Sequence, residues 1–527
     1  MAGGFYKAAF GMRVDGTRAW ERLPADVKAD TQTNRKEKCA RWLRRIFTFW
    51  NGKGVAHLTF WEYMRFAYDI YTKPLNDVAR RAYTRHGRLY GSYQGTVPTL
   101  VVGDADILRE ILVKKFKNFS DRSLSQTVGS DVWKKSIMNL SGDEWKKARA
   151  IFTRALTPSK FKMILAKIKP IAGKMTSRVI DAAAERKPVN FSELASNVAF
   201  DTAAALNYSV DTYSEVDKDH TIMKCLENIA MGPSGWRIVM MFLMPTLYKG
   251  LQPDYPPKSS TDVFKAFVSH VIEDRMSKNK EEDDFLQVFM NADYNWEYDS
   301  ARKSDRYEIK KMSLDEMTAQ IILFFMAGVD SVSNALTVTA YYLALNPESQ
   351  DKVIAEIDKA LAKDGVTYNS LQEVQYLDAC IKEAMRLCIP DSILLRVCTE
   401  ETTVAGIHFK PGMCVEIPVA GIHYDPEYFP EPESFNPDRF MPENKDSIRP
   451  FTYMPFGAGP RNCAGMRLGF LQVKATLACL LQHVRLETCS GTMIPLKFKS
   501  GQFLLNFDGP LLLQAVPRNH SGNNTSF

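Results

Sequence analysis

One loop near the C-terminus brings together residue types that can hold a reactive sulfur. It reads MPFGAGPRNCAG, Met454 to Gly465, and has three glycines and two prolines around one cysteine. Such residues favour a tight turn in which backbone amides approach the sulfur of Cys463 closely. The residues that follow predict a helix, so Cys463 lies near its positive end. Both features stabilise a thiolate.

A thiolate in such a loop is a suitable axial ligand for haem iron. It donates electron density that favours cleavage of an O–O bond, and amide hydrogen bonds to the sulfur restrain that donation. An isolated cysteine is more often buried core filler, and GAGPRN also looks like part of a nucleotide-binding loop. The nucleotide interpretation fails because the third glycine and a surrounding βαβ unit are missing.

The same loop carries a resemblance to a known family. FGAGPRNCAG resembles the haem-binding signature F-x-x-G-x-R-x-C-x-G of the cytochrome P-450 superfamily, and the match covers Phe456, Gly459, Arg461, Cys463 and Gly465. The resemblance implies that Cys463 binds the haem iron within a cofactor loop that includes Gly465. It also implies that Phe456 shields the sulfur and that Arg461 meets a haem propionate.

Two further motifs resemble a structural charge cluster of that family. KEAMRL places Glu383 and Arg386 three residues apart on one helix face, and FNPDRF supplies Arg439. In the family, such an E-x-x-R pair and a later arginine form a buried cluster behind the haem loop. The alternative for the pair alone is a surface contact worth a few tenths of a kcal/mol.

Other positions resemble the groups that hold the haem propionates. SGDEWKKARAIF carries Trp145 and Arg149 four residues apart, and ILLRVC carries Arg396. Two anionic propionates need cationic donors, and the fixed fork of arginine suits carboxylates. The resemblance therefore assigns Trp145, Arg149 and Arg396 to cofactor binding.

One long helix is predicted by its end signals. A capping box, Ser313 to Glu316, opens an apolar run that stops at Asn346 before Pro347. At about 1.5 Å per residue this helix spans roughly 45 to 50 Å. It should cross the whole body of the protein.

The middle of this helix resembles the family element A/G-G-x-D/E-T. Ala327 and Gly328 remove side-chain bulk next to the haem, and we expect a local break there that frees carbonyl groups for water or dioxygen. The resemblance implies that Asp330 and the hydroxyl of Ser331 relay protons to bound dioxygen. Ser331 stands where threonine is usual in the family. The alternative is a transverse core helix with a glycine kink.

The remaining patterns predict a mainly α fold with small β-sheets (α+β). Turn residues separate short β-type runs between Thr84 and Val102, and successive helices follow from about Asp104 to His483. The resemblance implies a cytochrome P-450 fold, with haem between the long transverse helix and the helix after the cysteine loop. We expect an N-terminal extension at residues 1–72, a single catalytic haem domain at 73–515 and a disordered tail at 516–527.

The N-terminal extension is rich in basic and aromatic residues. Residues 35–71 suit a membrane interface, or equally an amphipathic helix packed on its own domain. No stretch approaches eighteen uninterrupted apolar residues, so no transmembrane helix is predicted. Residues 232–251 give the same two options, a segment that dips into the membrane or a buried helix hairpin. The resemblance places the enzyme on the cytoplasmic face of the endoplasmic reticulum membrane; a mitochondrial or soluble location stays open.

Charge and cysteine usage exclude several other classes of protein. The 527 residues carry a formal net charge of +7, with basic and acidic residues interspersed, which argues against nucleic-acid binding. Nine cysteines occur without a C-x-x-C pair, so neither a zinc site nor a disulfide framework is indicated. A reducing compartment fits this pattern.

The resemblance is closest to animal microsomal enzymes of the drug-metabolising family 3 and their invertebrate relatives. It implies a hydrophobic small-molecule substrate. The pocket residues expected from it are Phe119, Phe325, Ala327, Ile393, Leu394 and Leu504. A basic surface for an acidic electron donor is expected from Lys146, Lys147, Arg467 and Lys474. An NADPH-dependent flavoprotein reductase is the expected donor, with a ferredoxin as the alternative.

These features predict a haem-thiolate monooxygenase that inserts one oxygen atom of O2 into a hydrophobic organic substrate. The alternative is a haem-thiolate isomerase or dehydratase that acts on peroxides without external electrons. Such enzymes often lack the acid and hydroxyl of the long helix, whereas Asp330 and Ser331 are both present. A non-catalytic haem protein or a lipid-binding module is the third interpretation.

Overall fold

The computed structural model describes residues 48–122, 130–209, 224–225, 236–244, 256–292, 311–502 and 504–518. The chain divides into two compact units, Met1–Val55 and Ala56–Phe527. Helix α4 (Phe60–Thr72) packs on α5 (Leu75–His86) within the second unit. The boundary that we expected after residue 72 therefore lies further along the chain than this division. Strand β10 (Leu512–Pro517) likewise continues past residue 515, and most of the expected tail lies outside the described residues.

Helices dominate the second unit, as the sequence predicted. The remaining α-helices are α6 (Ala105–Arg109), α7 (Asp131–Lys134), α8 (Gly142–Ala155), α9 (Pro158–Ala184), α10 (Phe191–Tyr208), α12 (Trp236–Leu243), α14 (Lys258–Lys278), α15 (Phe285–Met290), α16 (Leu314–Leu345), α17 (Pro347–Leu361), α18 (Tyr368–Glu373), α19 (Gln375–Leu387), α20 (Val419–His423) and α21 (Met466–Leu481). Short 3₁₀ or π turns are η1 (Glu110–Lys114), η2 (Phe116–Phe119), η4 (Pro437–Phe440) and η5 (Lys445–Ser447).

The described strands form three small sheets. The largest has the order β1-β2-β3-β8-β5 and is built from β1 (Ala56–His57), β2 (Leu89–Gln94), β3 (Val97–Val102), β8 (Cys414–Ile417) and β5 (Leu394–Val397). Strands β2 and β3 form the hairpin that the sequence predicted, while β3 and β8 run parallel. The others join β4 (Val189–Asn190), β10 and β9 (Val484–Glu487), and β6 (Thr402–Val404) with β7 (Ile407–Phe409).

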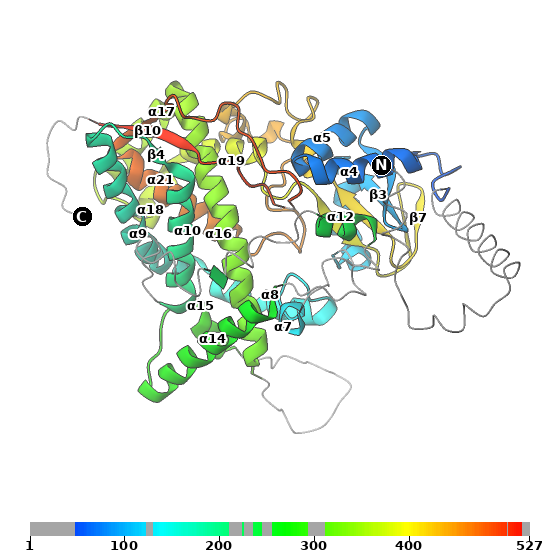
Figure 1. Ribbon diagram of the computed structural model, residues 1–527, viewed down its shortest axis with the longest axis horizontal. Coiled ribbons are helices and arrows are strands. Elements are labelled where there is room, and N and C mark those ends of the chain that lie inside the picture. The colour runs from blue at the N-terminus through cyan, green and yellow to red at the C-terminus, as the bar shows by residue number, and fades with distance from the viewer. Residues whose placement is uncertain are drawn as a thin grey trace, which may run out of the picture. The chain divides into compact units, whose positions relative to one another are not determined.

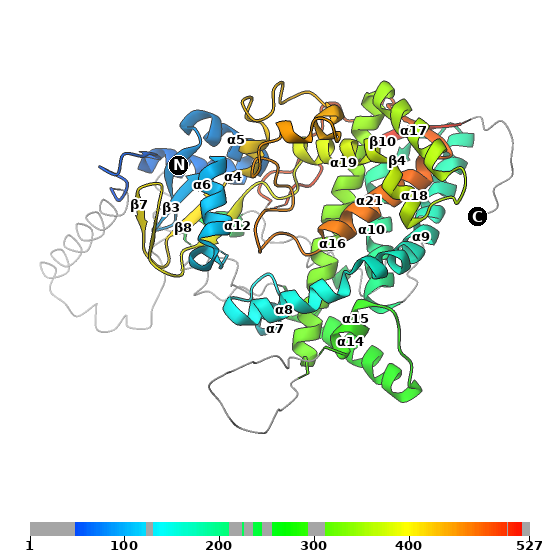
Figure 2. The same ribbon diagram turned by 180° about the vertical axis from the view of Figure 1, so that it is seen from behind.

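Helix α16 organises the helical part of the second unit. It packs against α10, α14, α19 and α21, and it runs between the group of helices around α9 and α10 and the largest sheet (Figure 1). The same arrangement is seen from behind in Figure 2. The predicted capping box is formed, since the Ser313 amide donates to Glu316 at 2.7 Å and the Glu316 amide donates to Ser313 at 3.3 Å. The helix ends before Pro347, as expected.

The expected break in α16 is not formed. The helix is continuous through Ala327 and Gly328, and the Ser331 hydroxyl donates to the Ala327 carbonyl at 2.5 Å. A serine that bonds back to the carbonyl one turn earlier uses the hydroxyl without interrupting the helix. The prediction of a break was therefore wrong, because the local sequence is compatible with an ordinary helical turn.

Tyr83 of α5 fills a narrow space between two glycines. A Cβ atom at Gly103 would stand 2.3 Å from the Tyr83 ring, and one at Gly421 would stand 2.5 Å from the Tyr83 Cβ. The Tyr83 hydroxyl donates to Asp425 at 2.7 Å. These contacts hold α5 against α20, the helix that ends at His423.

We predict that Gly103→Ala destabilises the protein by about 1 to 3 kcal/mol, because the added methyl group overlaps the ring of Tyr83. Urea unfolding followed by tryptophan fluorescence measures the change. In a Tyr83→Ala background the same substitution should cost little, since the obstructing atoms beyond Cβ are gone. An equal cost in both backgrounds would show that the overlap is not the cause.

Candidate active site

The cysteine loop is held by its own backbone and by two neighbouring elements. The Cys463 amide donates to the Phe456 carbonyl at 2.8 Å, which closes the turn. Gly459 adopts a φ of +75°, and a Cβ there would stand 2.3 Å from the Leu112 carbonyl oxygen. Only glycine satisfies both conditions. Arg149 of α8 donates to the Asn462 carbonyl and to its side-chain oxygen, both at 2.8 Å.

Cys463 differs from the other cysteines that the structure describes. Its side chain is exposed, whereas the remaining described cysteines are buried or half-buried. Desolvation raises the pKa of the Cys463 thiol, while the Gly465 and Met466 amides and the nearby Arg122 and Arg149 lower it. Desolvation outweighs the thiolate stabilisation that we expected. Bound iron would supply a positive charge that lowers this pKa.

Buried arginines gather near the cysteine loop. Arg396 and Arg461 are 3% and 4% exposed, and the Arg461 guanidinium lies 4.3 Å from the centre of the Trp145 ring. Burial lowers the pKa of both arginines to about 9, and repulsion from Arg122 adds to the effect. Burial also lowers the pKa of Arg122. Burial and mutual repulsion both disfavour the charged form of these arginines. An anionic partner would favour it.

The charge and hydrogen-bonding capacity of this cluster fit a haem. The Nε atoms of Arg122, Arg396 and Arg461 are buried and have no hydrogen-bond acceptor among the described residues. Two propionate carboxylates would supply both the acceptors and the negative charge. Bound haem would supply the dioxygen chemistry, with Cys463 as the residue suited to ligate its iron. Arg122 could not be identified from the sequence, because an arginine in FSDR carries no local signal that separates it from a surface arginine.

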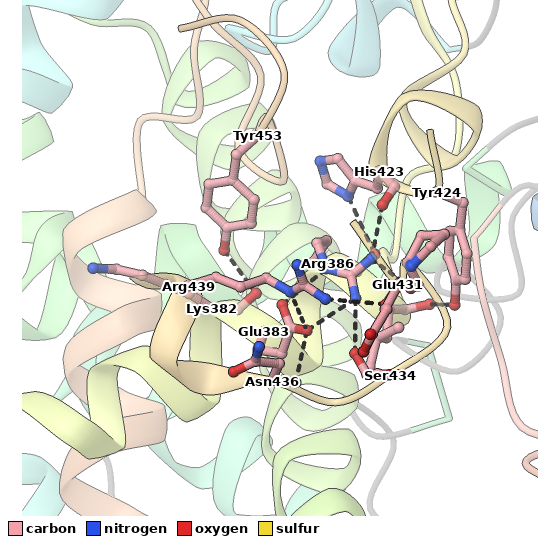
Figure 3. A network of polar contacts seen from close by, with 12 residues as sticks. Lys382, Glu383, Arg386, His423, Tyr424, Glu431, Ser434, Asn436, Arg439 and Tyr453 are labelled. Carbon is pink, nitrogen blue, oxygen red and sulfur yellow. Dashed lines mark hydrogen bonds and ion pairs between the residues drawn. The ribbon is translucent and has the colours of Figure 1, made fainter. Parts of the chain in front are cut away.

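The expected ion pair is formed and is fully buried. Arg386 donates two hydrogen bonds to Glu383, at 2.8 and 2.9 Å, and both side chains are 0% exposed. Arg439 adds a contact to Glu383 at 3.4 Å. Figure 3 shows that Arg386 also reaches the carbonyl groups of the chain that follows, through His423 at 2.7 Å and Ser434 at 3.2 Å. One arginine thus holds α19 to the segment that precedes the cysteine loop.

His423 connects this network to the cysteine loop, a role that the sequence analysis did not assign. Its Nε2 accepts a hydrogen bond from the Met454 amide at 3.0 Å, and its Nδ1 lies 3.2 Å from the Arg386 carbonyl. Since Nε2 accepts, the ring proton is on Nδ1, which donates to that carbonyl. Burial, reinforced by the charge of Arg386, lowers the pKa of His423 to about 3. The ring is therefore neutral at physiological pH.

Asp330 and Ser331 lie at the middle of α16. Burial raises the pKa of Asp330 to about 6, which brings it close to the range of a useful proton donor. The adjoining Val332 packs near Gly469 of α21, where a Cβ would stand 3.7 Å from the valine methyl group. The acid and hydroxyl are therefore carried by a helix that touches the one beginning just after Cys463.

The expected substrate residues fall into two groups. Phe119 and Phe325 are each 1% exposed and pack on other aromatic rings, Phe119 on Phe409 and Phe325 on Phe264. Ala327 is exposed, Leu394 and Leu504 are half-buried, and Ile393 is 1% exposed. Sequence resemblance places a residue along the chain but does not show which way its side chain points.

One residue of the expected basic surface is buried. Lys474 is 3% exposed and lies 2.7 Å from Asp378 of α19, so its inclusion was wrong. The α21 face that carries it packs inward, which the spacing from Cys463 did not reveal. Lys146 and Arg467 are exposed and Lys147 is half-buried. Lys146 forms an exposed ion pair with Asp143 at 2.8 Å.

The chain is similar to known proteins over most of its length. The family model described as "Cytochrome P450" matches residues 53–513. Cytochrome P450 3A41 of Mus musculus is 33% identical over 455 residues, which cover 85% of this chain and 88% of that protein. Cytochrome P450 3A9 of Rattus norvegicus is 33% identical over 460 residues, 86% of this chain and 89% of that protein. Lithocholate 6-beta-hydroxylase of Mesocricetus auratus is 34% identical over 444 residues, 83% of this chain and 86% of that protein.

The chain belongs to the cytochrome P450 family. It is a haem-thiolate monooxygenase with the α+β fold of that family, and NADPH is its indirect source of electrons. The family implies a redox partner and a hydrophobic substrate. The peroxide isomerase alternative is not favoured by these relatives.

We predict that Glu383→Ala is produced largely without haem. Removal of the carboxylate leaves Arg386 buried without its counter-charge, at a cost of about 3 to 5 kcal/mol. Haem content per protein, measured as the pyridine complex, reports the loss. Glu433→Ala is the matched control, because Glu433 forms an exposed ion pair with Arg80 and should retain full haem. Full haem content in Glu383→Ala would contradict the assignment.

We predict that His423 makes the protein acid-labile. The unfolded chain takes up a proton near pH 6.5, whereas the folded protein does so only near the lowered pKa of about 3. Stability from the neutral ring is therefore present above pH 6.5 and is lost as the pH falls, by about 1.4 kcal/mol per pH unit.

The free energy of unfolding, measured in urea at steps of about one pH unit from about pH 4.5 to about pH 7.5, checks this expectation. His423→Gln should flatten the pH dependence, since glutamine does not titrate. His408→Gln, at an exposed histidine paired with Glu401, should not. Parallel pH curves for wild type and His423→Gln would refute the role of the neutral ring.

Proposed function

We propose that the residues assembled around Cys463 divide the work of monooxygenation. Cys463 ligates the iron, and Phe456 and Gly465 shape the loop around it. Arg122, Arg396 and Arg461 neutralise the propionates, with Trp145 as the ring on which Arg461 rests. Arg149 positions the loop through Asn462 rather than through a propionate. The unmatched buried arginines are the observation that carries this assignment.

Asp330 and Ser331 deliver protons in this proposal. A carboxyl group with a pKa of about 6 is part-ionised near neutral pH and can both give and regain a proton. The Ser331 hydroxyl donates to the Ala327 carbonyl, and it would have to leave that carbonyl before it could donate its proton elsewhere. Glu383, Arg386 and Arg439 act structurally, since their contacts hold the segment that leads to the loop.

The substrate in this proposal is a lipophilic molecule of the size of a steroid acid. Ala327, Leu394 and Leu504 line its pocket, and the buried Ile393, Phe119 and Phe325 support that lining from behind. One relative is named for the hydroxylation of lithocholate, which makes lithocholate a reasonable first compound. The electron donor is an NADPH-dependent flavoprotein reductase that docks on Lys146, Lys147 and Arg467.

The proposed location is the cytoplasmic face of the endoplasmic reticulum, with peripheral membrane contact through α4. One face of α4 is buried through Tyr63, Ala67 and Ile70. The opposite stripe is exposed: Trp61 77%, Met64 36%, Tyr68 62% and Tyr71 51%. Exposed aromatic side chains at this spacing suit a lipid interface. Residues 35–47 and most of 232–251 lie outside the described residues.

Only one described helix is long and apolar enough to cross a membrane. It is α16, and 61% of its most apolar window is buried inside the protein.

We predict that purified holoprotein, mixed with a flavoprotein reductase, NADPH and lithocholate, consumes O2 and forms a hydroxylated product. In Asp330→Asn the product yield per NADPH should fall at least tenfold while peroxide release rises, because proton delivery is impaired. The pH dependence of the wild-type yield, with a midpoint near 6, should vanish in this variant. Asp315→Asn, at the start of the same helix, is the control.

The proposed division of roles is contradicted if Asp330→Asn couples NADPH to product as well as wild type does. Turnover supported by a ferredoxin and not by the flavoprotein reductase would instead replace the proposed donor. Turnover of added peroxide without NADPH would favour the isomerase.

We predict that Trp61→Ser with Tyr68→Ser weakens binding to phosphatidylcholine vesicles containing anionic lipid by roughly tenfold, since two aromatic anchors are lost. Co-sedimentation with the vesicles measures this change. Met276→Ser, at a residue of α14 that is 72% exposed, is the matched control and should bind normally. Unchanged binding of the double variant would remove α4 from the membrane contact.

A further inference from the structure

A small cavity lies between α10, α15, α16 and α21. Its volume is about 30 Å³, and its walls include Asn207, Phe285, Phe324, Gly328, Leu468 and Gln472. Neither Cys463 nor any of the buried arginines lines it. Most of the wall is hydrocarbon, and two side-chain amides provide its polar part.

These two amides are buried and incompletely hydrogen-bonded. Asn207 is 1% exposed and Gln472 is 5% exposed. The Asn207 side-chain nitrogen donates to the Ala203 carbonyl at 2.7 Å, which leaves its Oδ1 as the free acceptor. Within the described part of the chain, Asn207 Oδ1 and Gln472 Nε2 have no hydrogen-bond partner. The residues that line the cavity therefore supply one unmatched acceptor and one unmatched donor, which is unusual for a protein interior.

Gly328 leaves additional space on the same wall. A Cβ atom built at Gly328 would have no neighbour within 4 Å. Its backbone belongs to an ordinary helix, so no special φ value requires glycine there. A close contact between helices does not explain this glycine either. The absence of a side chain at Gly328 keeps the cavity open beside the turn that carries Asp330 and Ser331.

We propose that this cavity binds a single water molecule, which accepts a hydrogen bond from Gln472 Nε2 and donates one to Asn207 Oδ1. A cavity needs a volume of about 10 to 15 Å³ to hold one water molecule. The volume of about 30 Å³ found here therefore admits water but is too small for an organic molecule. A water here satisfies both amides at once. The proposed water joins α10 to α21 beside α16. It would lie next to a continuous α16, whereas the sequence had predicted water within a break of that helix.

The direct test is a crystal structure of the haem-loaded enzyme at a resolution that shows ordered water. The expected result is one water peak within hydrogen-bond distance of both Asn207 Oδ1 and Gln472 Nε2. An empty cavity would overturn the proposal. A direct hydrogen bond between the two amides, with the cavity collapsed, would overturn it as well.

Thermal melting of three variants tests whether the two amides act through a shared partner. Asn207→Leu and Gln472→Leu should each lower the melting temperature by about 1 to 3 °C, because each leaves the other amide and the water without a partner. The double variant removes both polar groups, so its loss should be clearly smaller than the sum of the single losses.

Thr476→Val is the matched control. Thr476 lies on α21 and has a buried hydroxyl without a hydrogen-bond partner among the described residues, but it does not line the cavity. Its effect should add to that of Asn207→Leu. Additive losses for the Asn207 and Gln472 pair would contradict a shared water. The wild-type crystal structure decides the question even where a variant fails to fold.

Discussion

The buried ion pair between Glu383 and Arg386 holds together the segments that carry the active site. Two charges at 0% exposure are stable only when every hydrogen-bonding group is matched. Here Arg386 also binds carbonyl groups of the chain between His423 and Ser434, and the Asn436 amide donates to Glu383 at 3.0 Å. His423 carries the same network to Met454, the first residue of the cysteine loop. The position of Cys463 thus depends on Glu383, which lies about 80 residues earlier in the chain.

A second constraint is the cluster of buried arginines near the loop, whose Nε atoms have no acceptor among the described residues. Arg122, Arg396 and Arg461 repel one another, and burial removes the water that would screen them. An anionic cofactor would offset this repulsion if it bound here. Burial likewise raises the pKa of the Cys463 thiol, and bound iron would favour its thiolate form. The site is therefore electrostatically complementary to haem, an iron cation within a dicarboxylate.

The features that were predictable from sequence are those set by local chemistry. The cysteine loop is specified by glycines such as Gly459, which fits only because it lacks a side chain. The bounds of α16 follow from the capping box at Ser313 and from Pro347. The Glu383–Arg386 pair is also local, since three residues of helix bring the side chains together.

What could not be predicted depends on contacts between distant segments. Arg122 lies near Arg396 and Arg461, which are hundreds of residues away in the sequence. The residues on either side of Arg122 in the sequence do not indicate this proximity. Burial of Lys474 against Asp378 requires knowledge of which α21 face packs on α19. The inward orientation of Phe325 is decided by Phe264 and Phe200 from other helices. Periodicity and motif spacing contain no information about these partners.

The claim that Cys463 ligates haem is tested most directly by the absorption spectrum of the reduced protein under carbon monoxide. Wild type should show the strongly red-shifted Soret band of thiolate-ligated haem, and Cys463→Ser should lack it while keeping the fold. Far-ultraviolet circular dichroism of the variant checks the fold. A band typical of histidine ligation in wild type, or an unchanged red-shifted band in Cys463→Ser, would contradict the assignment of this cysteine.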